Sequence, residues 1–293
     1  MRAAFTEIVD YAGLFPPASC AMADAARQYD IYRRSPDRWM LGRFVVAAIR
    51  LQELAAAIEG GGIVIDPADP WRLSVVMGAL VPAELALIAA FQGAWESRGV
   101  LADSIEIRVG SVGQAITVGE QIPRSFRRYF EVPGTGPYRD LVGAIGAVGA
   151  FAKIRTGGTT PELFPAAEDV TTFLMAAVRH KVPFKATAGL HHPFRGSYPI
   201  SYAAQAEAQR MYGFVNLLVA TAELVRGGEG ETAEAILDDA DRQAFVLDAS
   251  GCSWRGERYT ASELATAHQQ YFLGFGSCSF REPFDELGLD HAA

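Results

Sequence analysis

Lysine is rare in this chain, and two of its three copies lie where buried strands are expected. Of 26 basic residues only Lys153, Lys181 and Lys185 are lysine; the others are arginine. A lysine ammonium, unlike a guanidinium, can lose its proton when desolvated or placed near another cation, and the free amine forms Schiff bases with carbonyl groups. Lys181 follows a predicted helix end and is interpreted as a solvated cation. The alternative is that an arginine-biased composition left three lysines by chance.

Ionisable residues occur on each of four consecutive expected strands, in otherwise apolar runs. Residues two apart on a strand share a face, so each strand presents its polar side chains together: Glu106 with Arg108, then Glu131, then Lys153 with Arg155, then Lys185 with Thr187. A Schiff-base lysine must be neutral, and a second cation nearby lowers its pKa, so we predict that Lys153 and Lys185 act as such a pair, with Glu106 and Glu131 as candidates for proton transfer. The alternative is two Glu–Lys ion pairs that only stabilise the fold.

Apolar, β-branched runs alternate with helical patterns along the chain. This alternation predicts an α/β protein with a parallel sheet. Seven strands without a glycine-rich dinucleotide fingerprint favour a (β/α)8 TIM-type barrel. The expected strands are 6–14, 41–47, 73–77, 104–109, 128–132, 151–155 and 183–187, and the expected helices are 21–34, 50–59, 82–95, 137–148 and 161–180.

Two segments could supply the eighth strand, 245–248 and 272–276, and we prefer the second. Residues 202–261 then form an extended excursion before the last strand. No linker or internal repeat divides the chain, so we expect a single barrel domain over residues 1–293. From residue 202 onward the patterns predict two helices, a hairpin and a final helix, over 202–226, 231–244, 245–259 and 262–271.

Composition restricts the classes of function. The formal net charge of −8 leaves no basic surface for nucleic acid. No run approaches the length of a membrane span, and the first residues do not resemble a signal peptide. Cys20, Cys252 and Cys278 have neither metal-site nor disulfide spacing, which favours a reducing cytoplasm. The apolar segment 211–218 indicates a buried helix or a subunit contact, so a homo-oligomer is left open.

Three segments on the expected strands resemble motifs of the 2-deoxyribose-5-phosphate aldolase family. They are 102–113 (ADSIEIRVGSVG), 153–162 (KIRTGGTTPE) and 185–190 (KATAGL). The similarity covers about 90 residues, as estimated from the span of these motifs along the parallel strands. The chain departs from the family where Glu106 replaces an aspartate, where Arg155 replaces a small residue and where Ala188 replaces a glycine.

The resemblance implies a class I aldolase on a (β/α)8 barrel, with Lys153 as the imine-forming residue and Lys185 as its partner. It places Glu106 at the acid–base position and implies a small aldehyde or ketone substrate, a phosphorylated one among the options. It requires no cofactor and no metal. The segment 276–279 (GSCS) faintly resembles the family's phosphate-binding loop.

Further polar residues are expected around the mouth of the barrel. We expect Asp10, Tyr11, His191, His192, Arg195, Gly276 and Ser277 to contact substrate, together with Arg108, Arg155 and Thr187. A metal-dependent hydrolase or isomerase using His191 and His192 with the two glutamates is an alternative, as is a non-catalytic ligand-binding barrel. Cys278 is a weak candidate nucleophile.

Overall fold

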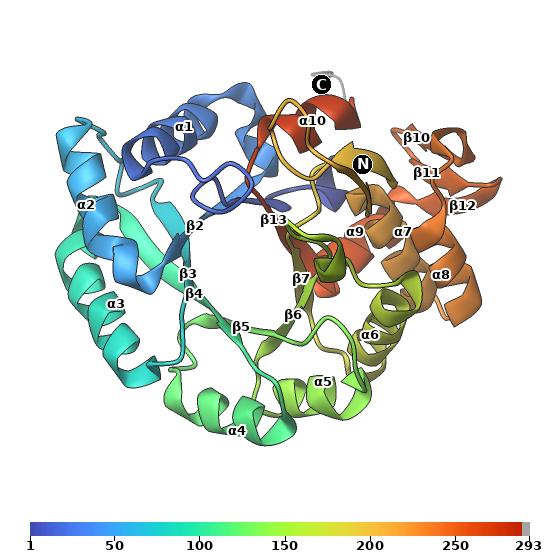
Figure 1. Ribbon diagram of the computed structural model, residues 1–293, viewed down its shortest axis with the longest axis horizontal. Helices are drawn as coiled ribbons and strands as arrows, with labels where there is room; N and C mark the ends of the chain where they lie inside the picture. The colour runs from blue at the N-terminus through green and yellow to red at the C-terminus, as the bar shows by residue number, and fades with distance from the viewer. Residues whose placement is uncertain (289–293) are drawn as a thin grey trace.

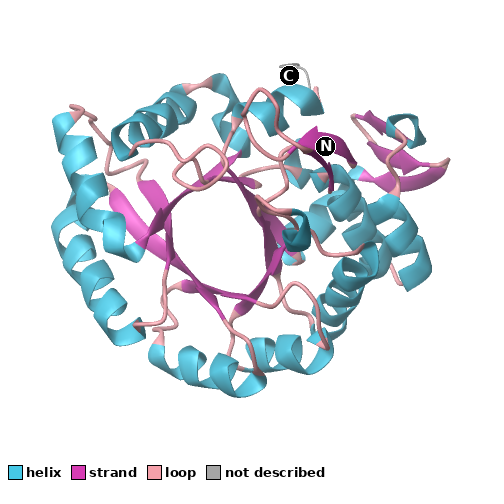
Figure 2. Cartoon of the chain, in the orientation of Figure 1, coloured by secondary structure: helices cyan, strands magenta, loops and turns pink. Residues whose placement is uncertain are grey.

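The computed structural model describes residues 1–288, which form a closed barrel of eight parallel strands (Figures 1 and 2). Neighbouring strands follow chain order, and β13 closes the barrel between β7 and β1. The predicted fold class is therefore confirmed. The barrel strands are β1 (Val9–Tyr11), β2 (Leu41–Ala47), β3 (Trp71–Val76), β4 (Val100–Arg108), β5 (Arg127–Glu131), β6 (Phe151–Arg155), β7 (Phe184–Thr187) and β13 (Phe272–Ser277).

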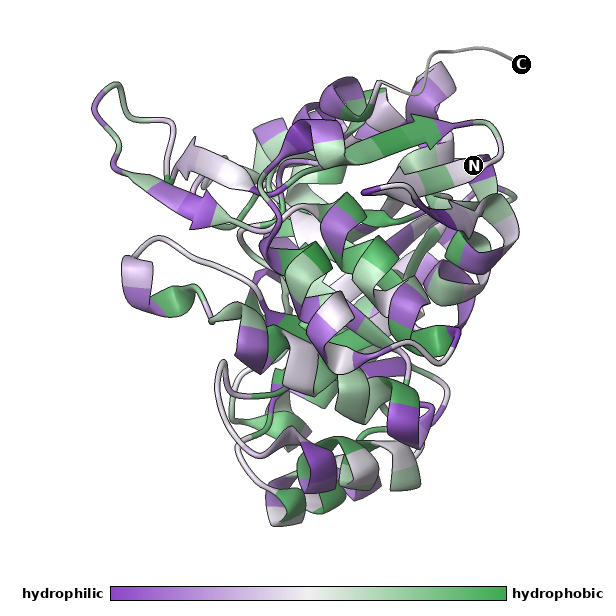
Figure 3. Ribbon diagram, turned by 90° about the vertical axis from the view of Figure 1, so that its right-hand side faces the viewer, coloured by the Kyte–Doolittle hydropathy of each residue, from purple (hydrophilic) through white to green (hydrophobic). Residues whose placement is uncertain are grey.

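Helices surround the strands, as Figure 2 shows. Within residues 1–288, no helix is both long enough and apolar enough to cross a membrane. Figure 3 shows hydrophilic and hydrophobic residues interspersed along the helices of the outer layer. One helix follows each of the first six strands: α1 (Met22–Arg34), α2 (Leu51–Gly60), α3 (Val81–Trp95), α4 (Val112–Gln121), α5 (Tyr138–Ala147) and α6 (Ala167–His180).

Helix α4 was not predicted from the sequence, although it carries a local start signal. The Ser111 side chain accepts a hydrogen bond from the backbone N–H of Gln114, which is the usual cap of a helix N-terminus. Two glycines in the helix weaken its apolar pattern. The predicted helix 161–180 instead divides into a 3-10 turn (Pro161–Leu163) and α6.

The excursion lies between β7 and β13, and the choice of 272–276 as the last strand is confirmed. The predicted helix 202–226 is wrong over its first half, where a hairpin of β8 (Gly196–Pro199) and β9 (Ala208–Met211) forms instead. The segment 203–210 is rich in good helix formers, but pairing with β8 overrides this propensity. The remainder comprises α7 (Phe214–Val225), α8 (Gly230–Asp238), a sheet of β10 (Phe245–Asp248), β11 (Gly251–Trp254) and β12 (Glu257–Thr260), α9 (Ala261–Gln270) and, after β13, α10 (Arg281–Leu287).

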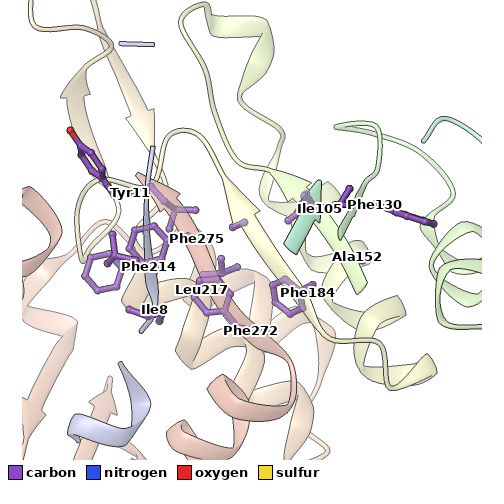
Figure 4. Packing of buried hydrophobic residues seen from close by; sticks show 14 of the residues in the cluster. Ile8, Tyr11, Ile105, Phe130, Ala152, Phe184, Phe214, Leu217, Phe272 and Phe275 are labelled. Atoms are coloured by element: carbon purple, nitrogen blue, oxygen red, sulfur yellow. The ribbon is translucent and has the colours of Figure 1, made fainter. Parts of the chain in front are cut away.

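Residues 289–293, the end of the predicted single domain, lie outside the described residues. The excursion packs onto the barrel through α7, which is buried on nearly all sides. Figure 4 shows Phe214 and Leu217 of α7 close to Phe272 and Phe275 of β13. The rings of Phe214 and Phe275 stack with centroids 5.0 Å apart. Segment 211–218, expected as a buried helix or a subunit contact, therefore contributes a buried helix to the core of this chain.

Two glycines of β13 differ sharply in how much side chain they tolerate. Gly274 has φ of +156°, and a Cβ there would lie 2.6 Å from the backbone oxygen of Ile8. Gly276 faces the barrel interior, where the nearest atom to an added Cβ is Thr187 Oγ1 at 3.5 Å. We expect Gly274→Ala to lower the free energy of unfolding by about 2 kcal/mol and Gly276→Ala to change it by less than about 1 kcal/mol. Urea denaturation of both variants checks this, and equal costs would contradict it.

Candidate active site

Two lysines and three carboxylates form one buried cluster inside the barrel. Lys153, Lys185 and Glu106 are 4%, 2% and 2% exposed, respectively. Lys153 Nζ lies 2.7 Å from Glu106 Oε2 and 2.7 Å from Glu131 Oε2. Lys185 Nζ lies 2.6 Å from Glu106 Oε1 and 2.5 Å from Asp10 Oδ2. The five charges therefore alternate in sign, in the order Asp10, Lys185, Glu106, Lys153 and Glu131, and each contacts the next. Buried ions are tolerated when they are paired in this way.

Strand register brings these side chains together. Lys153 of β6 pairs with Lys185 of β7 and, on its other side, with Glu131 of β5. Glu106 of β4 pairs with Tyr129, two residues before Glu131 on the same strand. Because alternate residues share a face, all of these side chains point into the barrel near its carboxyl-terminal end. The structure therefore brings together the four residues that the sequence suggested as catalytic.

Glu106 lies between the two lysines and bonds to each through a different oxygen. Burial alone would raise the pKa of Glu106, but Lys153 and Lys185 outweigh burial and hold that pKa far below its ordinary value. Burial alone would lower the pKa of Lys185, but Asp10 and Glu106 raise it above its ordinary value. Lys185 is consequently a permanent cation at neutral pH, and Glu106 is a permanent anion in the resting protein.

Glu131 connects the buried cluster to the mouth of the barrel. Its Oε2 accepts from Lys153, while its Oε1 lies 3.3 Å from Arg108 Nε and 3.3 Å from Arg155 Nη2. Burial alone would raise the pKa of Glu131, but Lys153 lowers it, with smaller contributions from Arg155 and Arg108. The Arg108 side chain is 75% exposed, so its guanidinium remains available to a ligand at the mouth.

Several contacts of the cluster were not predicted from the sequence. Ser74 of β3 donates from its hydroxyl to Glu106 Oε1 at 2.5 Å. The Tyr129 ring lies 5.2 Å from Lys185 Nζ, within the range of a cation–π contact. Asp10, expected at the mouth, instead belongs to the buried cluster: it accepts from Lys185 Nζ and from the backbone N–H of Arg43 at 2.6 Å, and it does not line the cavity. Ser74 could have been suspected from the sequence, because it is a polar residue next to apolar residues in an expected buried strand.

A cavity of about 770 Å³ opens above the cluster. Both lysines, both glutamates, Arg108, Arg155, Thr187, His191 and Gly276 line it. The cavity is of the size typical for small-molecule sites, and a few polar groups converge in it. The remaining lining comes from apolar residues and glycines with a few polar side chains: Ala12, Phe15, Pro16, Val45, Val76, Met77, Gly78, Ala79, Val81, Ile107, Gln114, Val118, Gln121, Gly158, Thr159, Leu163, Ala188 and Cys278.

His191 occupies the cavity wall next to the end of β13. Its Nδ1 lies 3.3 Å from Ser277 Oγ, 3.8 Å from Cys278 Sγ and 3.3 Å from Glu282 Oε2. Burial would lower the pKa of His191, but the contacts with Cys278 and Glu282 raise it to about 9. His191 is therefore a cation at neutral pH in the wall of the cavity, beside the end of β13.

Five residues expected to contact substrate do not line this cavity: Asp10, Tyr11, His192, Arg195 and Ser277. The Tyr11 hydroxyl donates to Gln28 Oε1 at 2.6 Å in the layer between barrel and α1, because its neighbour Asp10 takes the inward position on β1. His192 stacks on the Tyr198 ring with the centroids 3.5 Å apart and lines a smaller pocket that adjoins the cavity. Arg195 is buried against Asp238 and the Tyr212 ring. We correct the expected substrate contacts accordingly.

The metal-site alternative is not favoured by the side-chain arrangement. Within residues 1–288, no group of three or more His, Cys, Asp or Glu side chains is placed to hold a metal ion. The ring centroids of His191 and His192 are 6.4 Å apart, and their nearest carboxylates belong to Glu282 and Glu286. Glu106 and Glu131 are engaged by the lysines. The four residues of that alternative therefore do not converge.

Comparisons with known proteins leave the family open. No protein-family model and no curated protein matches the chain. Among solved structures, the spore cortex-lytic enzyme SleL of Bacillus cereus is similar in structure, with 13% sequence identity and a TM-score of 0.40. The superposition covers 96% of the present chain and 72% of the SleL chain. Similarity at this level does not assign a function. The resemblance to the 2-deoxyribose-5-phosphate aldolase family stays a prediction from the sequence motifs.

Proposed function

We propose that the protein is a Schiff-base-forming lyase of the class I aldolase type, acting on an aldehyde or ketone. The observation that supports this most is the Lys153 amine at the cavity floor, held between two carboxylates and close to a second lysine. A buried lysine is costly unless it is paired. A buried lysine that also lines a cavity of substrate size is a candidate nucleophile.

The resting ammonium of Lys153 must lose a proton before it reacts. Glu106 and Glu131 are both within 2.7 Å of it and can accept that proton. The free amine then attacks the carbonyl carbon, and the carbonyl oxygen takes a proton from the carboxylic acid to give a carbinolamine. The nitrogen, positively charged after its attack, gives one proton back to the carboxylate, which passes it to the hydroxyl; the hydroxyl leaves as water, and the protonated imine remains.

The imine is an electron sink for the carbon next to it. In the cleavage direction the bond between the α and β carbons breaks, the β-hydroxyl gives its proton to a carboxylate, and the electron pair forms an enamine. Lys185 remains charged throughout, because Asp10 and Glu106 hold its proton.

The enamine step gives a test that does not require the natural substrate. The protein should catalyse exchange of the α-hydrogens of acetone, dihydroxyacetone, pyruvate or phenylacetone for deuterium in D2O, measured by proton NMR. Exchange should select one of the two prochiral hydrogens of dihydroxyacetone, because the base is fixed on one side of the enamine. No exchange above that of free lysine with any of the four compounds would contradict the proposal.

A further inference from the structure

We infer that the substrate carries an apolar group, an aliphatic chain or an aromatic ring, that packs against the β1–β3 side of the cavity. This inference rests on the proposed function and names the substrate class for that site. The charged residues of the cavity all come from β4 and later elements. The lining residues from β1, β2, β3 and the loops after them are all apolar or glycine.

The apolar residues form one continuous wall. β1, β2 and β3 are hydrogen-bonded neighbours in the barrel. Each of these strands, or the segment that follows it, contributes side chains to the wall, among them Phe15, Val45, Met77, Ala79 and Val81. In Figure 1 the chain after β1 runs over the rim of the barrel on this side. A ligand that spans the cavity therefore meets charge on one side and hydrocarbon on the other.

The apolar surface continues outward to the rim on the same side. Ile49, just after β2, is 74% exposed, and Leu80, just after β3, is 69% exposed. Exposed apolar side chains occur singly on most proteins. Here, however, two of them follow the carboxyl ends of β2 and β3, adjacent strands that contribute to the apolar wall.

The size of the cavity also favours a substrate larger than a small sugar fragment. One water takes about 30 Å³ of liquid, so 770 Å³ corresponds to roughly 25 waters. A three-carbon carbonyl compound bound to Lys153 leaves most of this space empty. A polyhydroxylated chain in that space would lose hydrogen bonds to water along the β1–β3 side, where the wall offers no polar side chain in return.

Primary alcohols from propan-1-ol to hexan-1-ol test the wall directly, because they cannot form an imine. Each methylene buried against an apolar wall strengthens binding about fourfold. We therefore expect the Kd, measured by NMR titration, to fall by about 60-fold over the three added methylenes. A Kd that does not change with chain length would overturn the inference, whatever the outcome of the exchange assay.

A matched pair of variants locates the binding. Ala79 is exposed to the cavity and Ala83 is exposed on α3 outside it. Ala79→Asp should weaken binding of hexan-1-ol more than tenfold, because a carboxylate then faces the alkyl chain, and Ala83→Asp should leave it unchanged. Equal effects of the two substitutions would overturn the inference.

The aldehyde series separates this inference from the proposed function. Propanal and hexanal are reduced onto the protein with borohydride, and the concentration for half-maximal labelling is compared. Labelling by both, with hexanal effective at lower concentration, supports both statements. Equal half-maximal concentrations for the two aldehydes overturn the inference of an apolar substrate group and leave the lyase proposal standing. Chain-length-dependent binding of the alcohols with no labelling by either aldehyde overturns the lyase proposal alone.

Discussion

Replacing Lys153 with arginine should reduce α-hydrogen exchange by about 10⁴-fold, since removal of a covalent nucleophile typically has an effect of this size. Arginine stays protonated and cannot form the imine, yet its guanidinium can still bond to Glu106 and Glu131. The loss should thus appear in kcat with the fold intact. Proton NMR of the exchange reaction measures the rate, and circular dichroism checks the fold.

Two further lysine variants are the controls for this experiment. Lys181, at the end of α6, is exposed, so Lys181→Arg should leave the exchange rate unchanged. Lys185→Arg keeps the charge but not the size of the side chain, and we expect a loss of about 10- to 100-fold. A Lys153→Arg variant that retains exchange within tenfold of the natural protein would show that Lys153 is not the nucleophile.

Replacing Glu106 with glutamine should cause the largest loss of stability among substitutions in the cluster. Glu106 is the only described carboxylate that pairs with both buried lysines. Removal of one partner of a buried ion pair typically costs 3–5 kcal/mol. We expect about 3 kcal/mol, because each lysine keeps one other carboxylate, Asp10 or Glu131. Urea denaturation at pH 7 measures the difference.

The pH dependence of that difference gives an independent check. The pKa of Glu106 is lower in the folded protein than its ordinary value of 4.5. A lowered carboxyl pKa contributes stability that is complete above the unfolded pKa and is lost as the pH falls. The stability difference between the natural protein and Glu106→Gln should therefore shrink below about pH 4.5. A difference that stays constant to pH 3 would contradict the charged cluster.

Glu84 provides the matched control. It is also buried, but its carboxylate accepts from the backbone N–H of Gly78 at 2.6 Å, where a glutamine oxygen can replace it. We expect Glu84→Gln to cost about 1 kcal/mol or less. A cost for Glu84→Gln equal to that of Glu106→Gln would show that loss of any buried carboxyl, and not loss of the lysine pairs, is being measured.

The barrel could be predicted because its signals are local. The expected strands 41–47 and 151–155 coincide with β2 and β6. A parallel strand buried on both faces is a short apolar run, whose limits are set by the flanking polar and glycine residues. Part of the cluster could also be predicted from local signals. Glu106, Glu131, Lys153 and Lys185 are polar residues within apolar strands, and alternation along each strand places them on the inward face.

Contacts set by register and by distant segments could not be predicted. The pairing of Asp10 with Lys185 depends on β13 closing the barrel between β1 and β7, a contact across 175 residues. The position of Glu106 between the lysines depends on the register of β4 relative to β6 and β7. The alternation of inward and outward residues along one strand does not fix the register between strands. Tyr11 was misassigned because three residues of β1 give too short a pattern to fix which face is inward.

The most direct test of the central claim is to reduce the protein with borohydride in the presence of a carbonyl compound and map the adduct by peptide mass spectrometry. The account predicts a single adduct, on Lys153. It also predicts that Lys185 stays unmodified, because Asp10 and Glu106 keep it protonated. An adduct on Lys185, on Lys181 or at the N-terminus with none on Lys153 would contradict the account.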